Sequence, residues 1–459
     1  MNLCIVGGGW AGMAAAATAV ERGWHVTLLE ATRQLGGRAR GMVCRRPDGL
    51  SLNLDNGQHI LIGAYFEALS LMHRTGVEVE QDLLGIPLAM PFPDGKGIQT
   101  PAWATSFPSP LNAVVAIATA RGWSWSQRWA LVQRSTQWQG MGFACPEGTT
   151  VAELCQGLPD KVMQELVEPL CVSALNLPTG QACGQVFLRV MRDALFGTGF
   201  PPWSGSTLLL PRVDLSALFP AQAANWLRKH HEKRFDLRLG TRVSAVQRRG
   251  TGWSVHGENW SLECDGVIWA TAASPAAKAM AQSAAMAKHQ GQEALALGLS
   301  QWAADTAALE HTAIATVYTW TPGLRLPKPM LALRPQPSSH ESPAQFVFDR
   351  GQLHPHDASM QGVLAFVVSA AEGERDDLQR RVEAQARRQL GLKQLEPILT
   401  VVEKRATFAC TPSLKRPAQE IAKGLQAAGD FVSGPYPATL EGAVRSAHSA
   451  VLALKSPYQ

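Results

Sequence analysis

The chain has 459 residues, of which 46% are hydrophobic and 17% charged, and a formal net charge of +5. This length exceeds what one compact core holds and predicts two or three domains. The mild basicity is compatible with an anionic ligand or membrane surface but is far from the clustered charge of a nucleic-acid binder. The eight cysteines form no C-x-x-C pair and show no metal-ligand spacing, so we expect reduced thiols in a cytosolic protein without a metal site.

The first thirty residues are typical of a β-α-β unit. An apolar strand over residues 2–7 leads into GGGWAG, an alanine-rich helix follows, and a second strand ends at Glu30. Gly7, Gly9 and Gly12 have the G-x-G-x-x-G spacing that lets a pyrophosphate approach a helix N-terminus. Glu30 is placed to accept hydrogen bonds from ribose hydroxyls, and its charge disfavours a 2′-phosphate. The unit therefore predicts a site for a dinucleotide other than NADP.

Two polar segments follow this unit. The first, GGRAR over residues 36–40, contains Gly37 and Arg38 and predicts a second phosphate contact, the alternative being a solvated turn with surface arginines. The second, LDNGQHILIGAY over residues 54–65, places Asp55, Gln58 and His59 in an otherwise apolar stretch. A turn followed by a strand would explain these residues, and so would the wall of an active site.

The middle of the chain changes character twice. Helices are predicted over 149–177 within a helix-rich domain, and strands with hairpin-like turns over 234–257. Further strands are predicted over 264–274 and in TAIATVYTW and VLAFVVSAA, and a helix in ERDDLQRRVEAQARRQLG. The apolar run over 111–120 is too short to span a bilayer. The tryptophans between 103 and 138 are expected to form a substrate pocket, a membrane-facing mouth or ordinary packing.

The last distinctive segment is AAGDFVSGPYPATLEGAVRSA, which begins at residue 427. Asp430 follows a short apolar run, and Thr439 is expected to cap the helix that comes after it. An ordinary turn aspartate is the alternative for Asp430. No second G-x-G-x-x-G is present, so the sequence predicts no dedicated NAD(P)H site.

Together, GGGWAG, GGRAR and the C-terminal segment resemble the FAD-dependent amine oxidase and carotenoid desaturase superfamily. The segments LDNGQHILIGAY, LLLPRVDLSALFP and PATLEGAVRSA are similar to a narrower group, the squalene-associated FAD-dependent desaturase-like proteins. That group is regarded as the hydroxysqualene dehydroxylases of bacterial hopanoid pathways. The resemblance covers most of the chain, and its two end motifs are specific for the superfamily.

The resemblance implies an α/β fold in which a Rossmann-like FAD-binding domain of the glutathione-reductase and amine-oxidase type is interleaved with a helix-rich α+β substrate domain. The FAD-binding domain would comprise residues 1–70, 205–280 and 412–459, and the substrate domain residues 71–204 and 281–411. Residues at matching positions would hold FAD: Gly7, Gly9 and Gly12 at the pyrophosphate, Glu30 at the adenosine ribose, Gly37 and Arg38 near the pyrophosphate and flavin, the backbone of Val243 at the adenine, Asp430 at the ribityl or pyrophosphate, and the helix beginning near Thr439 at the flavin pyrimidine carbonyl.

The resemblance also implies a reaction, the reduction of the allylic alcohol hydroxysqualene to squalene. This reaction needs a hydride from reduced flavin and a proton for the departing hydroxyl. We expect Asp55, Gln58 and His59 to line the substrate face, with His59 as the proton donor and Asp55 orienting it. The alternative for His59 is a structural histidine in the flavin domain.

Other functions remain open on the sequence. A desaturase that oxidises a polyisoprenoid such as phytoene would use the same fold and cofactor. An amine oxidase would need an aromatic cage over the flavin, for which the C-terminal segment offers only Phe431 and Tyr436. A non-catalytic FAD-bearing lipid carrier or scaffold is a further alternative. The expected partners are an apolar polyisoprenoid, neighbouring squalene-pathway enzymes and the inner face of the bacterial membrane near residues 100–140, with no nucleic acid.

Overall fold

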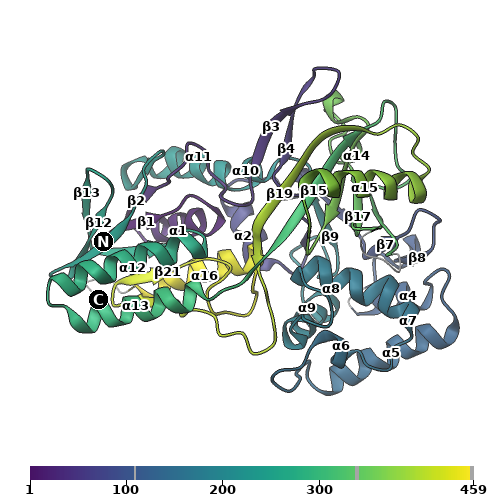
Figure 1. Cartoon of the computed structure of the whole chain (residues 1–459), viewed down its shortest axis with the longest axis horizontal. Helices are drawn as coiled ribbons and strands as arrows, with labels where there is room; N and C mark the ends of the chain where they lie inside the picture. The colour runs from purple at the N-terminus through teal and green to yellow at the C-terminus, as the bar shows by residue number, and fades with distance from the viewer. Residues whose placement is uncertain (108–109, 336–340, 455–459) are drawn as a thin grey trace.

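The chain folds into two adjoining parts, and the polypeptide passes between them several times (Figure 1). The computed structural model describes residues 1–107, 110–335 and 341–454, and the predictions for 108–109, 336–340 and 455–459 lie outside these ranges. The first part is assembled from the beginning, the middle and the end of the chain, and the second from the segments between them. The interleaved α/β architecture is therefore confirmed.

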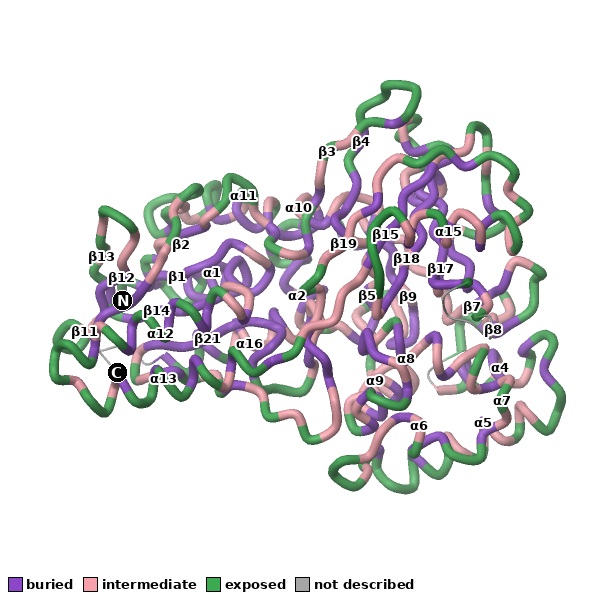
Figure 2. The backbone as a smooth tube through the Cα atoms, viewed as in Figure 1, coloured by how far each residue is buried: buried purple, intermediate pink, exposed green. Residues whose placement is uncertain are grey.

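A six-stranded sheet in the order β10-β2-β1-β14-β21-β20 forms the centre of the first part. Its strands are β1 (Asn2–Val6), β2 (His25–Leu29), β10 (Phe235–Arg238), β14 (Gly266–Trp269), β20 (Glu420–Ala422) and β21 (Leu425–Ala427). All pairs are parallel except β20 with β21. In β1, Leu3 and Ile5 enter one hydrophobic core while Cys4 and Val6 enter the other. This strand is a continuous apolar run because both of its faces are covered (Figure 2).

Helices cover both faces of this sheet (Figure 1). One core contains α1 (Trp10–Glu21), α11 (Pro220–His231) and α16 (Leu440–Ala453). The other contains α12 (Ala273–His289), α13 (Glu293–Ala307) and a small sheet of β11 (Ala245–Arg249), β12 (Gly252–His256) and β13 (Ser261–Cys264). The strands expected over 234–257 and 264–274 are thus confirmed.

The predicted domain division at residue 280 is wrong because it falls inside α12. The next helix, α13, packs on α12 and places Leu299 and Trp302 in the same core as Trp253 and Phe431. The first part therefore continues to the end of α13. The chain enters the second part only at β15.

A five-stranded antiparallel sheet in the order β16-β17-β18-β15-β19 organises the second part. It consists of β15 (His311–Trp320), β16 (Met330–Ala332), β17 (Phe346–Asp349), β18 (Val363–Val368) and β19 (Glu396–Phe408). The helix α15 (Arg375–Leu390) packs on one face through Leu378, Val382 and Ala386. The two strands and the helix predicted for this region are confirmed.

The rest of the second part is a helical unit with its own core, which includes Trp123, Trp138 and Phe187. It contains α4 (Leu111–Ala118), α5 (Trp125–Gly140), α6 (Val151–Leu154), α7 (Asp160–Val162), a π-helical turn (Met163–Val167), α8 (Glu168–Leu175) and α9 (Gly184–Phe196). The helices predicted over 149–177 are confirmed, but they form several short helices. Pro159 is the N-cap of α7, and the π-helical turn comes directly before α8, which has Pro169 in its first turn. Among the described residues, no helix is both long enough and apolar enough to cross a membrane.

The remaining elements are short. They are β3 (Gly41–Arg45), β4 (Ser51–Asp55), β5 (Leu61–Ile62), α2 (Phe66–Arg74), α3 (Val79–Asp82), β6 (Leu83–Ile86), β7 (Ala89–Pro91), β8 (Gly97–Gln99), β9 (Leu208–Pro211), α10 (Leu215–Leu218) and α14 (Arg350–Leu353), with 3-10 turns at Ala102–Ala104, Glu232–Arg234 and Ala358–Met360. The β3–β4 hairpin contributes Leu52 and Leu54 to a core shared with Tyr318 of β15. The segment that ends at Asp55 is thereby anchored to the second part.

Candidate active site

The glycine turn between β1 and α1 is built by close backbone contacts. Gly7 has a φ of 111°, and a methyl group added to Gly12 would lie 1.8 Å from the carbonyl oxygen of Gly7. Gly9 is different, because a methyl group there would meet no atom nearer than 3.8 Å. Gly9 is the N-cap of α1 and has no side-chain cap. The turn therefore keeps α1 tight against the sheet while leaving space and free N–H groups for an anion at the helix N-terminus.

Glu30 lies at the end of β2, beside this turn. Its carboxylate accepts the N–H of Gly8 at 2.7 Å and the N–H of Thr32 at 2.7 Å. The side chain is almost fully buried. The acid thus fixes the shape of the glycine turn and lies where the fingerprint requires a ribose acceptor. Its contact with a ribose stays a prediction.

The GGRAR segment meets the C-terminal Gly-Asp segment at the same edge of the sheet. Gly36 forms a bridge with Gly9, and Gly37 lies against Gly9 with its φ at 63°. Arg38 forms an ion pair with Asp430 and donates from its other Nη atom to the carbonyl of Ala406 at 2.7 Å. Arg38 is therefore not a solvated surface arginine, and Asp430 is not an isolated turn residue.

Two further residues that are predicted to contact FAD are Thr439 and Val243. Thr439 is the N-cap of α16, and its hydroxyl accepts the N–H of Gly442 at 2.9 Å. Val243 lies between β10 and β11 with its side chain packed on the core. Within the described part of the chain, no hydrogen bond of the Val243 backbone is present. Its N–H and carbonyl are thus available to a ligand edge, and the adenine contact stays a prediction.

A cavity of about 170 Å³ lies where these segments meet the sheet of the second part. Its lining includes Arg38, Ala272, His311, Arg405, Asp430 and Phe431. His311 begins β15, and Arg405 of β19 donates to the hydroxyl of Ser274 at 2.9 Å. Burial lowers the pKa of His311, and the charges of Arg38 and Arg405 act in the same direction. Sequence reasoning missed His311 and Arg405, because strand residues without a local motif carry no signal of the site they face.

Asp55 and His59 do not pair, so that prediction is wrong. One carboxylate oxygen of Asp55 accepts the N–H of Leu215 at 2.8 Å, and the other lies 3.7 Å from a guanidinium nitrogen of Arg350. The Nδ1 atom of His59 lies 2.7 Å from the carbonyl oxygen of Gly57. The physical reason is the turn after β4, which directs the two side chains to different neighbours.

Arg350 is a further functional candidate that the sequence did not reveal. The side chain is 0% exposed, and it donates to the Oε1 atom of Gln58 at 2.6 Å. Among the residues that the structure describes, its Nε and Nη2 atoms have no hydrogen-bond partner, and neither has the Oδ2 atom of Asp55. The hydroxyl of Tyr318 donates to the carbonyl of Asp55 at 2.9 Å. Asp55 and Gln58 therefore belong to a buried polar cluster with Arg350, instead of sharing a surface with His59.

Burial and the charge of Arg350 both shift the pKa values of the acidic and basic groups in this cluster. Burial raises the pKa of Asp55 to about 6, although Arg350 lowers it. His354, which follows α14, has its pKa lowered to about 3 by burial and by the charge of Arg350. A carboxyl group with such a pKa changes its charge between mildly acidic and neutral solution, while His354 stays neutral.

His59 is the member of the LDNGQH segment whose pKa responds to Arg38. Burial lowers the pKa of its imidazole, and the positive charge of Arg38 lowers it further. The hydrogen bond to the carbonyl of Gly57 acts in the opposite direction and raises this pKa. Because a carbonyl only accepts, Nδ1 carries the proton of the neutral ring and Nε2 is left as an acceptor. The Gln58 side chain donates to the His59 carbonyl at 3.2 Å, which ties this histidine to Arg350 through one residue.

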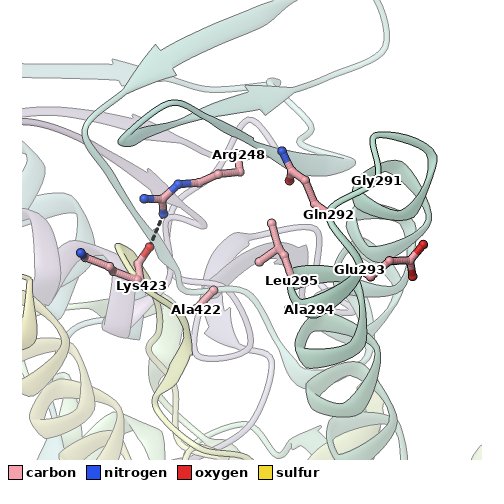
Figure 3. Close-up of a pocket in the computed structure, with 8 residues that line it drawn as sticks. All are labelled: Arg248, Gly291, Gln292, Glu293, Ala294, Leu295, Ala422 and Lys423. Carbon is pink, nitrogen blue, oxygen red and sulfur yellow. Dashed lines mark hydrogen bonds between the residues drawn. The ribbon is translucent and has the colours of Figure 1, made fainter.

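A second hollow, of about 540 Å³, lies on the first part at the N-terminal end of α13 (Figure 3). There Arg248 donates to the carbonyl of Lys423 at 2.5 Å, beside Gln292 and Leu295. None of the residues that line it is a predicted site residue. The candidate site is therefore the cavity beside Arg38 and Asp430.

Comparison with known proteins identifies the family of this chain. A family model described as flavin containing amine oxidoreductase matches residues 10–454. The chain belongs to this family. It is an FAD-dependent oxidoreductase, and its cofactor is FAD. The superfamily resemblance of the glycine turn, the GGRAR segment and the C-terminal segment is thereby confirmed.

Individual relatives differ in how much of the chain they match. A hydroxysqualene dehydroxylase of Sinorhizobium fredii is 24% identical over 98% of this chain and 97% of its own length. A carotenoid phi-ring synthase of Streptomyces griseus is 32% identical over 25% of this chain, and the match spans only 22% of that relative. Among solved structures, an oxidoreductase from Methanosarcina mazei superposes with a TM-score of 0.70 at 14% identity, covering 98% of this chain and 99% of its own.

The residues present fit FAD. The open position at Gly9 and the uncapped N-terminus of α1 suit a pyrophosphate, and Glu30 lies next to them. Arg38 supplies a cation at the same edge, and Asp430 is the acid that comes from the other end of the chain. The N-terminus of α16, which carries a partial positive charge, begins beside Asp430, because the N–H of Ala438 donates to the carbonyl of Asp430 at 3.1 Å. Apart from Ala438, each of these residues was predicted from the sequence.

Proposed function

We propose that this oxidoreductase reduces hydroxysqualene to squalene. The observation that carries the proposal is the alignment with a hydroxysqualene dehydroxylase over nearly the whole of both chains. The resemblance of the LDNGQHILIGAY and LLLPRVDLSALFP segments to that group supports it. These two segments contact each other, because Asp55 of the first accepts the N–H of Leu215 of the second.

In the proposed reaction, the allylic C–O bond breaks, a C–H bond forms at the same carbon, and the hydroxyl leaves as water after taking up a proton. FAD, when bound and reduced, supplies the hydride. We assign the proton to His59, whose Nε2 forms no hydrogen bond with any residue that the structure describes. The lowered pKa of His59 makes its protonated form a strong acid, at the expense of a small protonated fraction at about pH 7.

The two aromatic residues that an amine oxidase would need do not form a cage. Phe431 is buried and packs edge-on against Trp302 at 6.4 Å between ring centroids. Tyr436 instead lies between the guanidinium groups of Arg189 and Arg445, at 5.6 and 4.7 Å. Oxidation of an amine therefore has less support than reduction of an alcohol.

A carotenoid-type desaturation is the second candidate, favoured by a local match to a zeta-carotene desaturase of Synechocystis, which is 36% identical over 17% of this chain and 15% of its own length. It would use the same cofactor in the opposite redox direction. One experiment separates the two. The purified protein is reduced with dithionite without oxygen, excess reductant is removed, and hydroxysqualene is added in detergent while flavin absorbance and extracted lipids are followed.

Reoxidation of the flavin with one equivalent of squalene is the expected result. Stable reduced flavin with unchanged alcohol would overturn the proposal, and the oxidised protein would then be offered phytoene-like hydrocarbons. His59→Ala tests the proton assignment, and Asp55→Asn tests the buried cluster. His25→Ala is the matched control because it removes an exposed histidine at the start of β2.

A further inference from the structure

The three exposed tryptophans of the chain lie close together in sequence. Trp103, Trp125 and Trp129 have 62%, 76% and 68% of their surface exposed. The other eleven of the 14 tryptophans are buried or half-buried. Large aromatic side chains this exposed are rare on soluble surfaces and mark a contact with something else. The packing alternative for this stretch comprised core packing and surface packing, and core packing is wrong for these three residues.

These rings belong to neighbouring segments of the helical unit. Trp125 and Trp129 are four residues apart on α5, so they lie on one side of that helix, and Leu131 and Trp138 face the core on the other. The ring of Phe107 contacts that of Trp103 at 5.7 Å. The helix α4 packs against α5 and exposes Leu111. We call Trp103, Phe107, Leu111, Trp125 and Trp129 the aromatic surface.

The charged residues of the segment that carries the aromatic surface all have one sign. Residues 95–146 contain Lys96, Arg121, Arg128 and Arg134 and neither aspartate nor glutamate. Lys96 contacts Asp94 at 3.5 Å, but across residues 1–107, 110–335 and 341–454 the three arginines have no carboxylate in ion-pair range. Arg128 stacks on the ring of Trp125 at 4.8 Å. Cationic groups beside interfacial rings are what an anionic lipid headgroup layer attracts.

We propose that the aromatic surface docks this enzyme on an anionic lipid bilayer. Tryptophan prefers the headgroup region because its ring is apolar and its N–H is polar, and arginine pairs with lipid phosphates. The helix α5, which carries two of these rings, lies on the far side of the helical unit from the six-stranded sheet (Figure 1). If the proposed function holds, the bilayer is also the phase in which the polyisoprenoid substrate is dissolved.

The test is flotation of the full-length holoenzyme with vesicles. One vesicle is phosphatidylcholine with about a third phosphatidylglycerol, and the other is phosphatidylcholine alone. We expect the protein to float with the anionic vesicle, to do so less as salt is added, and to remain largely unbound with the neutral one. Trp125→Ser combined with Trp129→Ser is expected to lower the bound fraction about tenfold, and Arg121→Glu several-fold.

Matched controls come from the other end of the molecule. Leu297→Ser and Lys288→Glu change an exposed apolar and an exposed basic residue on α13 and α12. They are expected to float like the unchanged protein. Retained flavin absorbance shows that a variant is folded. No flotation with either vesicle, or equal losses in the control variants, would overturn the proposal. Because binding is measured without turnover, this result is independent of whether hydroxysqualene is reduced in detergent.

Discussion

Replacing Arg350 by methionine tests the buried cluster most directly. The guanidinium lies 3.7 Å from the Asp55 carboxylate, and both side chains are essentially unexposed. At that distance and an effective dielectric constant of about 20, two unit charges attract by about 4 kcal/mol. Removal of one member leaves the other charge buried and unpaired, which costs about 3–5 kcal/mol of unfolding free energy. We expect a loss of about 4 kcal/mol near pH 8.

The loss of unfolding free energy caused by Arg350→Met is expected to depend on pH, and the direction of this dependence follows from the pKa of Asp55. The pKa of Asp55 in the folded protein is about 6, above the ordinary value of 3.8. The folded protein therefore binds a proton that the unfolded chain lacks, and stability rises as pH falls through about 6. Near pH 5 the carboxyl is neutral with or without Arg350, so the loss shrinks to about 1–2 kcal/mol, the cost of leaving the Gln58 oxygen unpaired.

Urea unfolding followed by far-ultraviolet circular dichroism, with saturating FAD, measures these values at both pH conditions. Asp55→Asn supplies the control, because in that background the Arg350→Met step has no carboxylate to expose and its cost should be the same at both. A loss in the single variant that does not change with pH would refute the ion-pair reasoning. An unchanged unfolding free energy would show that Arg350 is not held as the structure describes.

Three other predictions concern the cofactor site. Because the pKa of His59 is lowered, kcat should rise as pH falls below about 6.5. In a pH-rate series, His59→Ala should abolish this rise and lower kcat about 10²–10⁴-fold. The Gly9→Ala variant should fold normally but bind FAD about tenfold more weakly, as measured by fluorescence titration. The Gly12→Ala variant should lose about 3 kcal/mol or more of unfolding free energy, because its methyl group would overlap the Gly7 carbonyl. Equal effects of the two substitutions would contradict the geometry of the glycine turn. Thr439→Ala should lower the free energy of unfolding by about 1 kcal/mol, because it removes a helix cap. Glu441→Ala should lower it by about 3 kcal/mol, because two N–H groups of α2 lose their acceptor. Thermal unfolding measures both, and a larger effect at Thr439 than at Glu441 would contradict this reasoning.

Local features carried the sequence-based predictions that the structure confirms. The glycine turn, Glu30 and the cap at Thr439 are each defined within a few residues, so spacing alone locates them. Arg350 is different, because its hydrogen-bond partner Gln58 is 292 positions away and its own neighbours show no motif. The domain division failed for a related reason. The alanine-rich pattern of α12 predicts a helix but does not indicate which core the helix joins.

The ion pair between Arg38 and Asp430 has a consequence for the order in which the molecule is completed. The two residues are 392 positions apart, and α16, which follows Asp430, packs against α1 near the start of the chain. A growing polypeptide therefore presents its glycine turn on the ribosome long before the acid and the helix that finish the pocket have been synthesised. We therefore expect FAD retention to require residues 430–454, and a protein that lacks them through premature termination or proteolysis should have no flavin colour.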